Sequence, residues 1–445
     1  MRTIVRGAKI YTGEAAIDGC DLVVEDSAVA AIEPEGTGSG RADEEVVDAR
    51  GCVVVPGVID THVHFRQPGM TDAADIRSES RAAAAGGVTT YFDMPNNTPA
   101  TTSRAAIEAK REIARRDSAV NYSFYLGATN DNIDEIKAID ARRVCGVKVF
   151  MGSSTGNMLV EGGEVLRRVF AESRVPVVAH CEDMATIDRR AEEVMSRYGK
   201  DAGVEWHPYI RSAESCYKSS SQAVEIAKET GAQLHVAHIS TARELELFTP
   251  GDTQITAEAC IPHLVFSDED YAKLGARIKC NPAIKTAADR EALRQALKEG
   301  GRIYTVATDH APHLPARKRG GAFTAASGMP GVQFSLINML ELCEQGYLSI
   351  EQMVRLMAVR PATLFKVERR GLLREGYFAD FAILKHSDRY TLEESEIVSK
   401  CGWSPYTGRE YSWRVEATYS NGRRVYSRAE GFAPDAHGQE ITFCR

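Results

Sequence analysis

The sequence predicts an α/β fold, a (β/α)8 barrel of the TIM type with a small β domain formed from both chain ends. Short apolar, β-branched runs alternate with helical segments through the middle of the chain, which is typical of a barrel of parallel strands. Both ends of the chain contain short strands and turns instead. The 445 residues suffice for one large barrel and one smaller domain.

The two chain ends share a pattern, and neither holds enough apolar sequence for a core of its own. Short strands are expected over residues 3–10, 21–25 and 28–33, then a Gly/Ser-rich turn at 35–40, and further strands over 381–384, 413–420 and 423–426. Strands without a core need partners to be stable. We therefore predict one small β domain from residues 1–52 and 366–445, with a C-terminal tail, around a catalytic barrel at residues 53–365.

The middle of the chain supplies the barrel. Its first strand is predicted in the run from Val53 to Gly69, whose β-branched residues favour a strand buried on both faces. The other strands are predicted over residues 88–94, 121–128, 144–151, 175–181, 233–240, 253–259 and 304–308. Helices are predicted over residues 78–85, 103–117, 133–138, 164–173, 221–230 and 290–299, with a long helical insertion before the fifth of them.

Composition restricts the class of function. A formal net charge of -8 with no basic run argues against a general nucleic-acid binder. No apolar run is long enough for a membrane helix, and the N-terminus lacks the apolar core of a signal peptide. The ten cysteines contain no C-x-x-C pair and are predicted to be reduced thiols. We expect a cytoplasmic protein.

The first candidate site is the pair His62 and His64 at the end of the first barrel strand. Strand side chains alternate between faces, so these two imidazoles point the same way, with Arg66 next in line. Two imidazoles at the C-terminal end of a barrel strand can hold a divalent metal such as zinc. The alternative is a polar strand end with two solvated histidines.

Further polar residues lie at the ends of later strands. Lys148 stands between apolar residues of the fourth strand, either extending out of the barrel mouth or buried as a neutral amine that adds carbon dioxide. The resulting carbamate would offer two oxygens to two cations. His180 ends the fifth strand, and of the sixth strand's two histidines we choose His238, because His235 has the opposite parity and is assigned to packing. In the eighth strand the same parity favours Asp309 over His310.

Four imidazoles, a lysine and a carboxylate at five strand ends predict a binuclear metal site. Such sites hold two ions roughly 3.5–4 Å apart and catalyse hydrolysis through a shared hydroxide. A carboxylate beside that hydroxide can take its proton and pass it to a leaving nitrogen. From the residues alone, the substrate of this metal-assisted hydrolysis stays open.

The motifs resemble those of the amidohydrolase superfamily, and within it those of the dihydroorotases. The similarity covers nearly the whole chain and is carried by residues 60–69, 93–99, 258–264, 279–283, 308–313 and 371–380. The His-x-His opening is shared by the whole superfamily, whereas the contexts of Arg66 and Asn96 are more specific.

This resemblance implies two zinc ions. His62, His64 and Asp309 would hold one ion, His180 and His238 the other, and carbamylated Lys148 would bridge them. Cobalt or manganese could replace zinc at such ligands. Some long dihydroorotases bridge the metals with an aspartate after the fourth strand, but here residues 151–157 contain no acid, so Lys148 is expected.

The implied reaction is the reversible hydrolysis of L-dihydroorotate to N-carbamoyl-L-aspartate in pyrimidine biosynthesis. A metal-bridging hydroxide attacks the ring carbonyl, and Asp309 acts as general base and then general acid. Arg66, Asn96 and His313 would bind the substrate carboxylate, because a guanidinium can grip a carboxylate through two hydrogen bonds. Asn281 would contact the pyrimidine ring. The alternatives are a surface salt bridge for Arg66 and turn-forming roles for the asparagines.

Two other functions stay open at this stage. Residues 148–151 and 328–331 also resemble hydantoinases (dihydropyrimidinases) and allantoinases, which act on uncharged cyclic ureides and typically lack an arginine at the position of Arg66. A metal-free relative serving as a scaffold is the remote alternative, although it would be expected to lose ligands. The resemblance also implies a homodimer. The basic run at 317–321 is expected to be a solvated surface loop.

Overall fold

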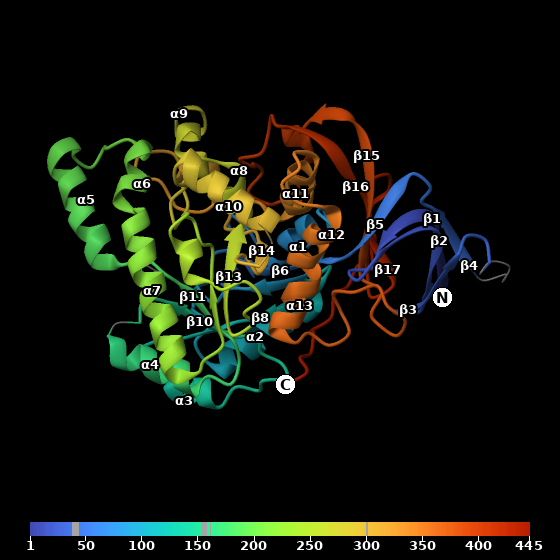
Figure 1. The fold of residues 1–445 in the computed structure, drawn as a ribbon, viewed down its shortest axis with the longest axis horizontal. Helices are drawn as coiled ribbons and strands as arrows, with labels where there is room; N and C mark the ends of the chain where they lie inside the picture. Colours follow the sequence, from blue (N-terminus) through green and yellow to red (C-terminus); the bar gives the residue numbers. More distant parts are fainter. Residues whose placement is uncertain (38–43, 153–157, 161, 300) are drawn as a thin grey trace.

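The computed structural model describes residues 1–37, 44–152, 158–160, 162–299 and 301–445. A barrel of parallel strands lies beside a sheet in which the N-terminal strands (blue) adjoin the C-terminal strands (red) (Figure 1). Parts of two predicted segments, the Gly/Ser-rich turn at 38–40 and the loop at 153–157, lie outside the described residues. Within the described residues, no helix has the length and apolar content needed to cross a membrane.

The predicted eight-stranded barrel is confirmed. Its third strand is interrupted at Tyr125, so the eight positions are occupied by β6 (Val58–Val63), β7 (Val88–Asp93), β8 (Asn121–Phe124) with β9 (Leu126–Gly127), β10 (Val147–Phe150), β11 (Val177–His180), β12 (Leu234–Val236), β13 (Ile255–Cys260) and β14 (Thr305–Ala307). Neighbouring strands pair in parallel. A bridge between Val63 and His310 closes the ring, and the His64 amide donates to the His310 carbonyl over 2.7 Å.

The long opening run forms two strands rather than one. Strand β5 (Cys52–Pro56) pairs with β1 and β15 of the small sheet, and β6 begins the barrel two residues later. Gly57 separates them, and a Cβ there would lie 2.1 Å from the Thr89 hydroxyl, so a larger residue does not fit. All six residues of β6 are buried, as expected for a strand covered on both faces.

Helices surround the barrel. They are α1 (Ile76–Ala85), α2 (Arg104–Asp117), α3 (Ile133–Lys137), α4 (Gly163–Glu172), α5 (Met184–Tyr198), α6 (His207–Ile210), α7 (Ala213–Thr230), α8 (Ile261–Val265), α9 (Tyr271–Leu274), α10 (Ala287–Glu299), α11 (Ser335–Glu344), α12 (Ile350–Val354) and α13 (Arg360–Phe365). Short 3-10 turns include η1 (Val204–Trp206) and η5 (Pro315–Lys318). Most long helices begin at a side-chain cap, such as Ser103 before α2 and Ser212 before α7.

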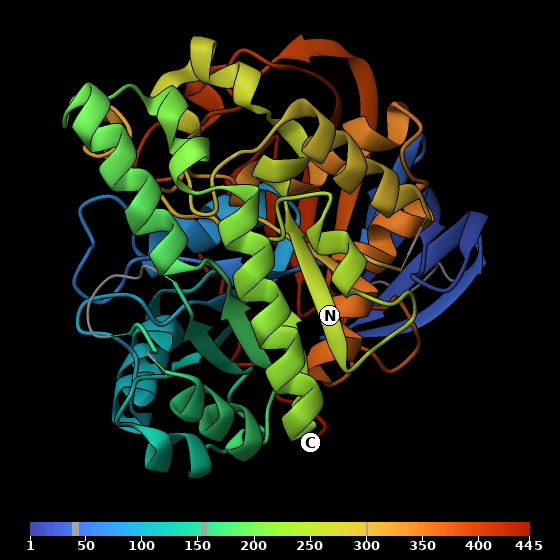
Figure 2. The same cartoon turned by 60° about the vertical axis from the view of Figure 1, so that its left-hand side comes forward.

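The predicted helical insertion between β11 and β12 consists of α5, α6 and α7. The long helix α7 (green) lies in front of the barrel strands in Figure 2. A small apolar cluster that includes Ile187, Val194 and Ile210 joins α5 to α6. The cluster also contains Ala322, which lies in the loop after β14. The insertion therefore has a core of its own beside the barrel.

The small β domain is built from both chain ends, as predicted. Its nine-stranded sheet, within the described residues, comprises β1 (Arg2–Tyr11), β2 (Ala16–Glu25), β3 (Ala28–Pro34), β4 (Glu44–Asp48), β5, β15 (Phe381–Thr391), β16 (Glu410–Ser420), β17 (Arg423–Ser427) and β18 (Gly431–Phe432). Side chains from both ends, including Val5, Val54 and Phe381, share one apolar cluster. The exact domain boundaries at 52/53 and 365/366 stay a prediction.

The C-terminal tail returns to the barrel. The Ile441 amide donates to the Tyr122 carbonyl over 3.1 Å, and the buried Phe443 ring lies 6.0 Å from the Phe92 ring. Phe443 shares an apolar cluster with Ile59 and Phe365. The tail thus packs against the barrel as well as following the small domain in sequence.

Candidate metal centre and substrate site

His62, His64 and Asp309 lie together at the C-terminal end of the barrel strands. One Asp309 carboxylate oxygen is 3.3 Å from Nε2 of His62 and 2.9 Å from Nε2 of His64. Each residue offers one ligand atom, and these atoms all lie within 4.8 Å of one another. Two imidazole nitrogens and a carboxylate at this spacing can hold a divalent cation.

The other ring nitrogens of these two histidines are occupied by acceptors. Nδ1 of His62 donates to Glu258 over 2.7 Å, and Nδ1 of His64 donates to the Asn96 side-chain oxygen over 2.6 Å. Donation from Nδ1 leaves Nε2 unprotonated and directed at the site, the arrangement that metal-ligating histidines usually have. Asn96, predicted from sequence to bind substrate, therefore contacts His64 in this structure.

His180 and His238 form the second part of the centre. Nδ1 of His180 lies 2.9 Å from Nε2 of His238, and Nε2 of His180 donates to Glu182 over 2.8 Å. The His62 and His238 rings are 5.3 Å apart, so the two halves of the centre adjoin. The Nδ1 atom of His238 is buried and has no hydrogen-bond partner among the described residues.

Lys148 is completely buried, which excludes the alternative of a lysine that extends to solvent, and its charge acts to lower the pKa of His180 and of His238. Within the part of the chain that the structure describes, its Nζ has no hydrogen-bond partner. Burial lowers its pKa, although Glu258 and Asp309 act in the opposite direction. A buried amine with a lowered pKa and no hydrogen-bond partner is suited to forming a carbamate.

Three site residues have backbone conformations that side chains rarely adopt. The φ angles of Arg66, His238 and Asp309 are +66°, +39° and +48°. Strain of this kind, of order 1–3 kcal/mol per residue, persists where the surrounding structure imposes it and is frequent at active sites.

The positive φ of His238 affects where the side chains of His235 and His238 point. Strand β12 ends at Val236, so strict alternation does not reach His238, and both side chains point into the barrel. His235 lies deeper, with its ring nitrogens 2.8 Å from the Thr256 hydroxyl and 3.0 Å from the Thr305 hydroxyl. His238 lies beside His180, whereas the expectation that His235 and His238 lie on opposite faces is wrong. His310 does diverge from Asp309, and bonds to Glu79.

Arg66 and His313 lie beside the metal centre. Nε of Arg66 donates to the Pro312 carbonyl over 3.3 Å, and a terminal guanidinium nitrogen lies 3.3 Å from Nε2 of His313. The Arg66 side chain is buried, so it is not the surface salt bridge that the sequence left open. Burial lowers the pKa of Arg66 to about 10 and that of His313 to about 3.

Asn281 contacts the helical insertion. Its side-chain oxygen accepts from Nε2 of His207 over 3.1 Å, and the same nitrogen lies 2.9 Å from the Cys280 carbonyl. The chain segment just before Asn281 runs near the Arg66 partner His313. The Gly328 backbone amide donates to the Lys279 carbonyl, and a Cβ on Gly328 would lie 3.1 Å from Nε2 of His313. The segment that leads to Asn281 therefore runs past the loop that contains His313.

The protonation states suit a cation site. Burial lowers the pKa of His64 to about 4 and lowers those of His180 and His238, so these imidazoles are neutral near pH 7. Burial acts to raise the pKa of Asp309, but His62, His64 and Lys148 outweigh it and hold the pKa below its usual range. Neutral imidazoles and an ionised carboxylate are the forms that bind metal.

Four residues that contact the predicted site were not chosen from the sequence: Glu258, Glu182, His207 and Arg211. Glu258 stands between two alanines of a buried strand, and Glu182 follows His180 by two residues, so each carried a local signal. His207 and Arg211 belong to the insertion, and nothing in the local sequence connects them to the site.

The basic run at 317–321 also differs from expectation, because Lys318 is buried and donates to the carbonyls of Lys279, Ala326 and Gly328.

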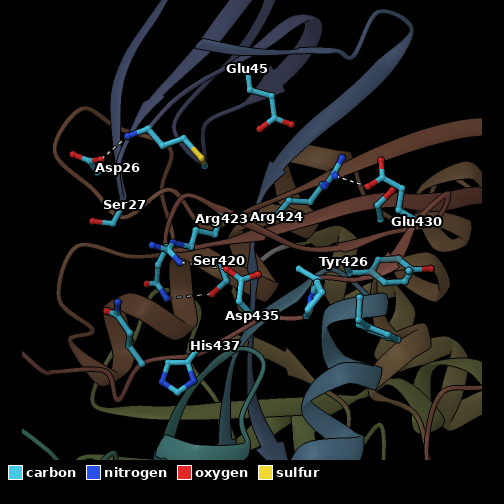
Figure 3. Close-up of a pocket in the computed structure, with 18 residues that line it drawn as sticks. Asp26, Ser27, Glu45, Ser420, Arg423, Arg424, Tyr426, Glu430, Asp435 and His437 are labelled. Carbon is cyan, nitrogen blue, oxygen red and sulfur yellow. Dashed lines mark hydrogen bonds and ion pairs between the residues drawn. The ribbon is translucent and has the colours of Figure 1, made fainter. Parts of the chain in front are cut away.

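A wide pocket elsewhere does not include the site. Its volume is about 820 Å³, and it lies between the N-terminal residues and the chain after β16, lined by Asp26, Arg423, Arg424 and Asp435 among others (Figure 3). The Arg423 guanidinium is 3.6 Å from Asp435, and Arg424 pairs with Glu430 over 2.6 Å. None of the predicted site residues lines it.

Fold and site together define a barrel enzyme whose candidate metal centre lies at the C-terminal mouth, where barrel enzymes keep their active sites. Residues 53–425 match the amidohydrolase family, and the chain belongs to that family as a cyclic amidohydrolase. The sequence-based resemblance to this superfamily is confirmed.

Relatives with different enzyme names are similar to this chain. An allantoinase of Bacillus velezensis is 34% identical over 433 residues, covering 95% of this chain and 93% of the relative. A dihydroorotase of Halobacterium salinarum is 36% identical over 397 residues, covering 87% of this chain and 91% of the relative. The solved L-hydantoinase (dihydropyrimidinase) of Arthrobacter aurescens has a TM-score of 0.91 at 26% identity, covering 99% of both chains.

Proposed function

We propose that this protein is a dihydroorotase, which catalyses the reversible hydrolysis of L-dihydroorotate to N-carbamoyl-L-aspartate in pyrimidine biosynthesis. The observation that carries the proposal is the state of Arg66. Its guanidinium is 7% exposed and contacts the Pro312 carbonyl and the His313 ring. Among the described residues, no carboxylate forms an ion pair with it.

A buried guanidinium without a directly bonded carboxylate is costly, although Asp309, Asp93 and Glu79 act on it from a greater distance. A ligand carboxylate that pairs with it directly would therefore gain affinity and specificity there. With its pKa lowered to about 10, Arg66 is still protonated near pH 7. The carboxylate of dihydroorotate is such a counter-ion, and uncharged ureides carry none. His313 and Asn96 are proposed to complete this carboxylate subsite, and Asn281 is proposed to contact the ring.

The metal cofactor is proposed to be a pair of zinc ions, and the donor set fits it. His62, His64 and Asp309 would hold one ion, His180 and His238 the other, and a carbamate on Lys148 would join them. The fit rests on the unpartnered buried Nζ of Lys148 and on ring nitrogens that are left free by donation from the opposite nitrogen. When bound, these ions would supply an activated water and polarise the scissile amide.

The protein's own residues handle the substrate and the proton. Arg66 binds the carboxylate and so orients the ring, which lowers the entropic part of the barrier. The Asp309 carboxylate is ionised and accepts the proton of the attacking water at its free oxygen. It then delivers that proton to the ring nitrogen that leaves the carbonyl carbon. Glu258, Glu182 and Asn96 keep the imidazoles in a fixed tautomer and orientation throughout.

An allantoinase or a hydantoinase (dihydropyrimidinase) is the second candidate. It is favoured by the 34% identity to the Bacillus velezensis allantoinase along nearly all of the chain, and by the likeness to the Arthrobacter aurescens L-hydantoinase. These activities differ from the first candidate mainly in the charge of the substrate. The non-catalytic alternative has less support, because His62, His64 and Asp309 offer ligand atoms within 4.8 Å of one another, and Nδ1 of His180 lies 2.9 Å from Nε2 of His238.

The test is steady-state hydrolysis of L-dihydroorotate, dihydrouracil, hydantoin and allantoin by the zinc-loaded wild type and by Arg66→Met. Dihydroorotate and dihydrouracil differ only in the carboxylate. We expect kcat/KM to favour dihydroorotate by at least about 100-fold, which corresponds to about 3 kcal/mol, and Arg66→Met to abolish that preference. Arg317→Met, at an exposed arginine of a nearby loop, is the matched control and should behave as wild type.

Two results would contradict the proposal. Turnover of allantoin or dihydrouracil at rates equal to or above that of dihydroorotate would assign the second candidate. Unchanged selectivity in a folded Arg66→Met protein would show that the buried guanidinium does not read the carboxylate. The wild-type comparison of the two rings stands even if the variant does not fold.

A further inference from the structure

The short helix α6 (His207–Ile210), taken together with its C-cap residue Arg211, presents two buried side chains to the site. His207 and Arg211 are four residues apart, and the Arg211 amide donates to the His207 carbonyl over 2.9 Å. Arg211 is the C-cap of α6, so it follows His207 by one helical turn. They are 3% and 8% exposed, whereas Tyr209 between them is 39% exposed. One face of this turn is therefore buried, and the other is open to solvent.

His207 contacts the predicted ring subsite. Its Nε2–H lies 3.1 Å from the Asn281 side-chain oxygen and 2.9 Å from the Cys280 carbonyl, and both can only accept. With the amide oxygen taken by this donor, the Asn281 amide nitrogen is the group left to face a ligand. An Asn281 held in this way offers donors to a substrate carbonyl.

Arg211 contacts the predicted metal centre through one intermediary. A terminal nitrogen of its guanidinium donates to Oε2 of Glu182 over 2.5 Å, and the same oxygen accepts from Nε2 of His180 over 2.8 Å. Glu182 is completely buried, so without Arg211 its charge would be poorly compensated. The ion pair thus holds the carboxylate that orients His180.

Contacts outside the barrel also support α6. Ile210 packs with Ile187 and Val194 in the small apolar cluster of the insertion, and Arg190 donates to the Tyr209 carbonyl over 3.3 Å. The Ala322 amide donates to the Ala202 carbonyl over 2.9 Å, which joins the insertion to the loop after β14. The turn is fixed from several sides.

We propose that α6 positions both halves of the active site: His207 sets the amide orientation of Asn281 for a substrate carbonyl, and Arg211, through Glu182, sets His180 for metal binding. Both are positioning residues and not catalytic ones. The His207 half rests on the proposed function, since it assumes that Asn281 contacts a ring substrate. The Arg211 half rests only on the candidate metal centre. The two effects are separable, because the two side chains reach different partners.

The experiment measures Zn²⁺ affinity and substrate kinetics separately on the full chain. Chelator-treated protein is titrated with Zn²⁺ against a competing chelator, and KM and kcat for L-dihydroorotate are measured at saturating Zn²⁺. Arg211→Met should weaken Zn²⁺ binding about 10–100-fold, as losses of such outer partners typically do, with KM changed less than threefold. His207→Leu should raise KM about 10-fold or more, with Zn²⁺ affinity unchanged.

Conservative variants and a control complete the design. His207→Gln keeps a hydrogen-bond donor, so its KM should return most of the way from the raised value of His207→Leu to that of wild type. Glu182→Gln should weaken Zn²⁺ binding as Arg211→Met does. Tyr209→Phe alters the exposed side of the same turn and should change neither quantity. Folding of each variant is checked by its Tm.

The proposal is overturned if folded Arg211→Met and His207→Leu shift Zn²⁺ affinity and KM in parallel, or shift neither. Parallel shifts would mean that α6 supports the fold without dividing its effect between the two halves. Failure of the proposed function is distinguishable, because the Zn²⁺ titration needs no substrate. If the wild type prefers another cyclic ureide, KM is measured with that ring, whose carbonyl Asn281 is equally expected to meet.

Discussion

The Nδ1 atom of His62 lies 2.7 Å from a carboxylate oxygen of Glu258, although 196 residues separate them in the chain. The same oxygen accepts from the backbone amide of His238 over 3.2 Å. One buried carboxylate thus contacts ligands from both halves of the candidate centre. His62 and Lys148 help to lower the pKa of Glu258 to about 2 against the opposing effect of burial, so it is ionised near pH 7.

Glu258→Gln is expected to weaken Zn²⁺ binding about 10–100-fold, because an amide holds the His62 tautomer less firmly than a carboxylate. Chelator competition measures this. Glu244→Gln is the matched control, since Glu244 is also buried but bonds to Ser220 and Thr241 and to no predicted ligand. Equal effects of the two variants would contradict a specific role for Glu258.

Lys148→Met is expected to lower kcat/KM at least about 1,000-fold, because it removes the only proposed ligand that spans both ions. Wild type loaded with ¹³C-bicarbonate and zinc should give a carbamate carbon signal by NMR, which the variant lacks. Lys366→Met, at an exposed lysine, should keep the signal. A wild type that is active without any carbamate signal would refute the bridging role.

Acid is expected to destabilise the fold through His235. Burial lowers its pKa to about 4, whereas the unfolded chain takes up that proton near pH 6.5. The stability that neutral His235 contributes to the folded state is therefore complete above pH 6.5. It is lost as the pH falls toward 4, by about 1.4 kcal/mol per pH unit. His235→Gln should flatten the dependence of Tm on pH in this range. The exposed His437→Gln should leave it as in wild type, and identical curves for all three would exclude the linkage.

Phe443→Ala is expected to destabilise the barrel, although the residue lies in the C-terminal tail. Its ring is completely buried against Phe92 and Phe365, and removing such a ring typically costs about 3–5 kcal/mol. Thermal unfolding measures the loss. Cys444→Ser, at the exposed neighbouring position, should change Tm little. A wild-type Tm for Phe443→Ala would mean that the tail does not contribute to barrel stability.

Local sequence patterns determined much of this protein. The alternation of β-branched runs with helical segments predicts all eight barrel strands, because a strand covered on both faces must be apolar along its length. The two-residue period places His62 and His64 together, since successive strand side chains alternate between faces. Lys148 was predicted as a site residue because an ammonium within an apolar strand is costly. These inferences depend on neighbours in sequence.

Tertiary structure decided what depends on distant neighbours or on backbone conformations that no period describes. His238 points into the site because β12 ends at Val236 and the chain turns through a positive φ, which strand parity does not anticipate. His62 meets Glu258, and Asn281 meets His207, only because closing the barrel and packing the insertion bring remote segments together. Lys318 is buried for the same reason, since three backbone carbonyls of the folded chain replace its water. Such polar contacts follow from desolvation in the folded state, and a linear pattern carries no record of it.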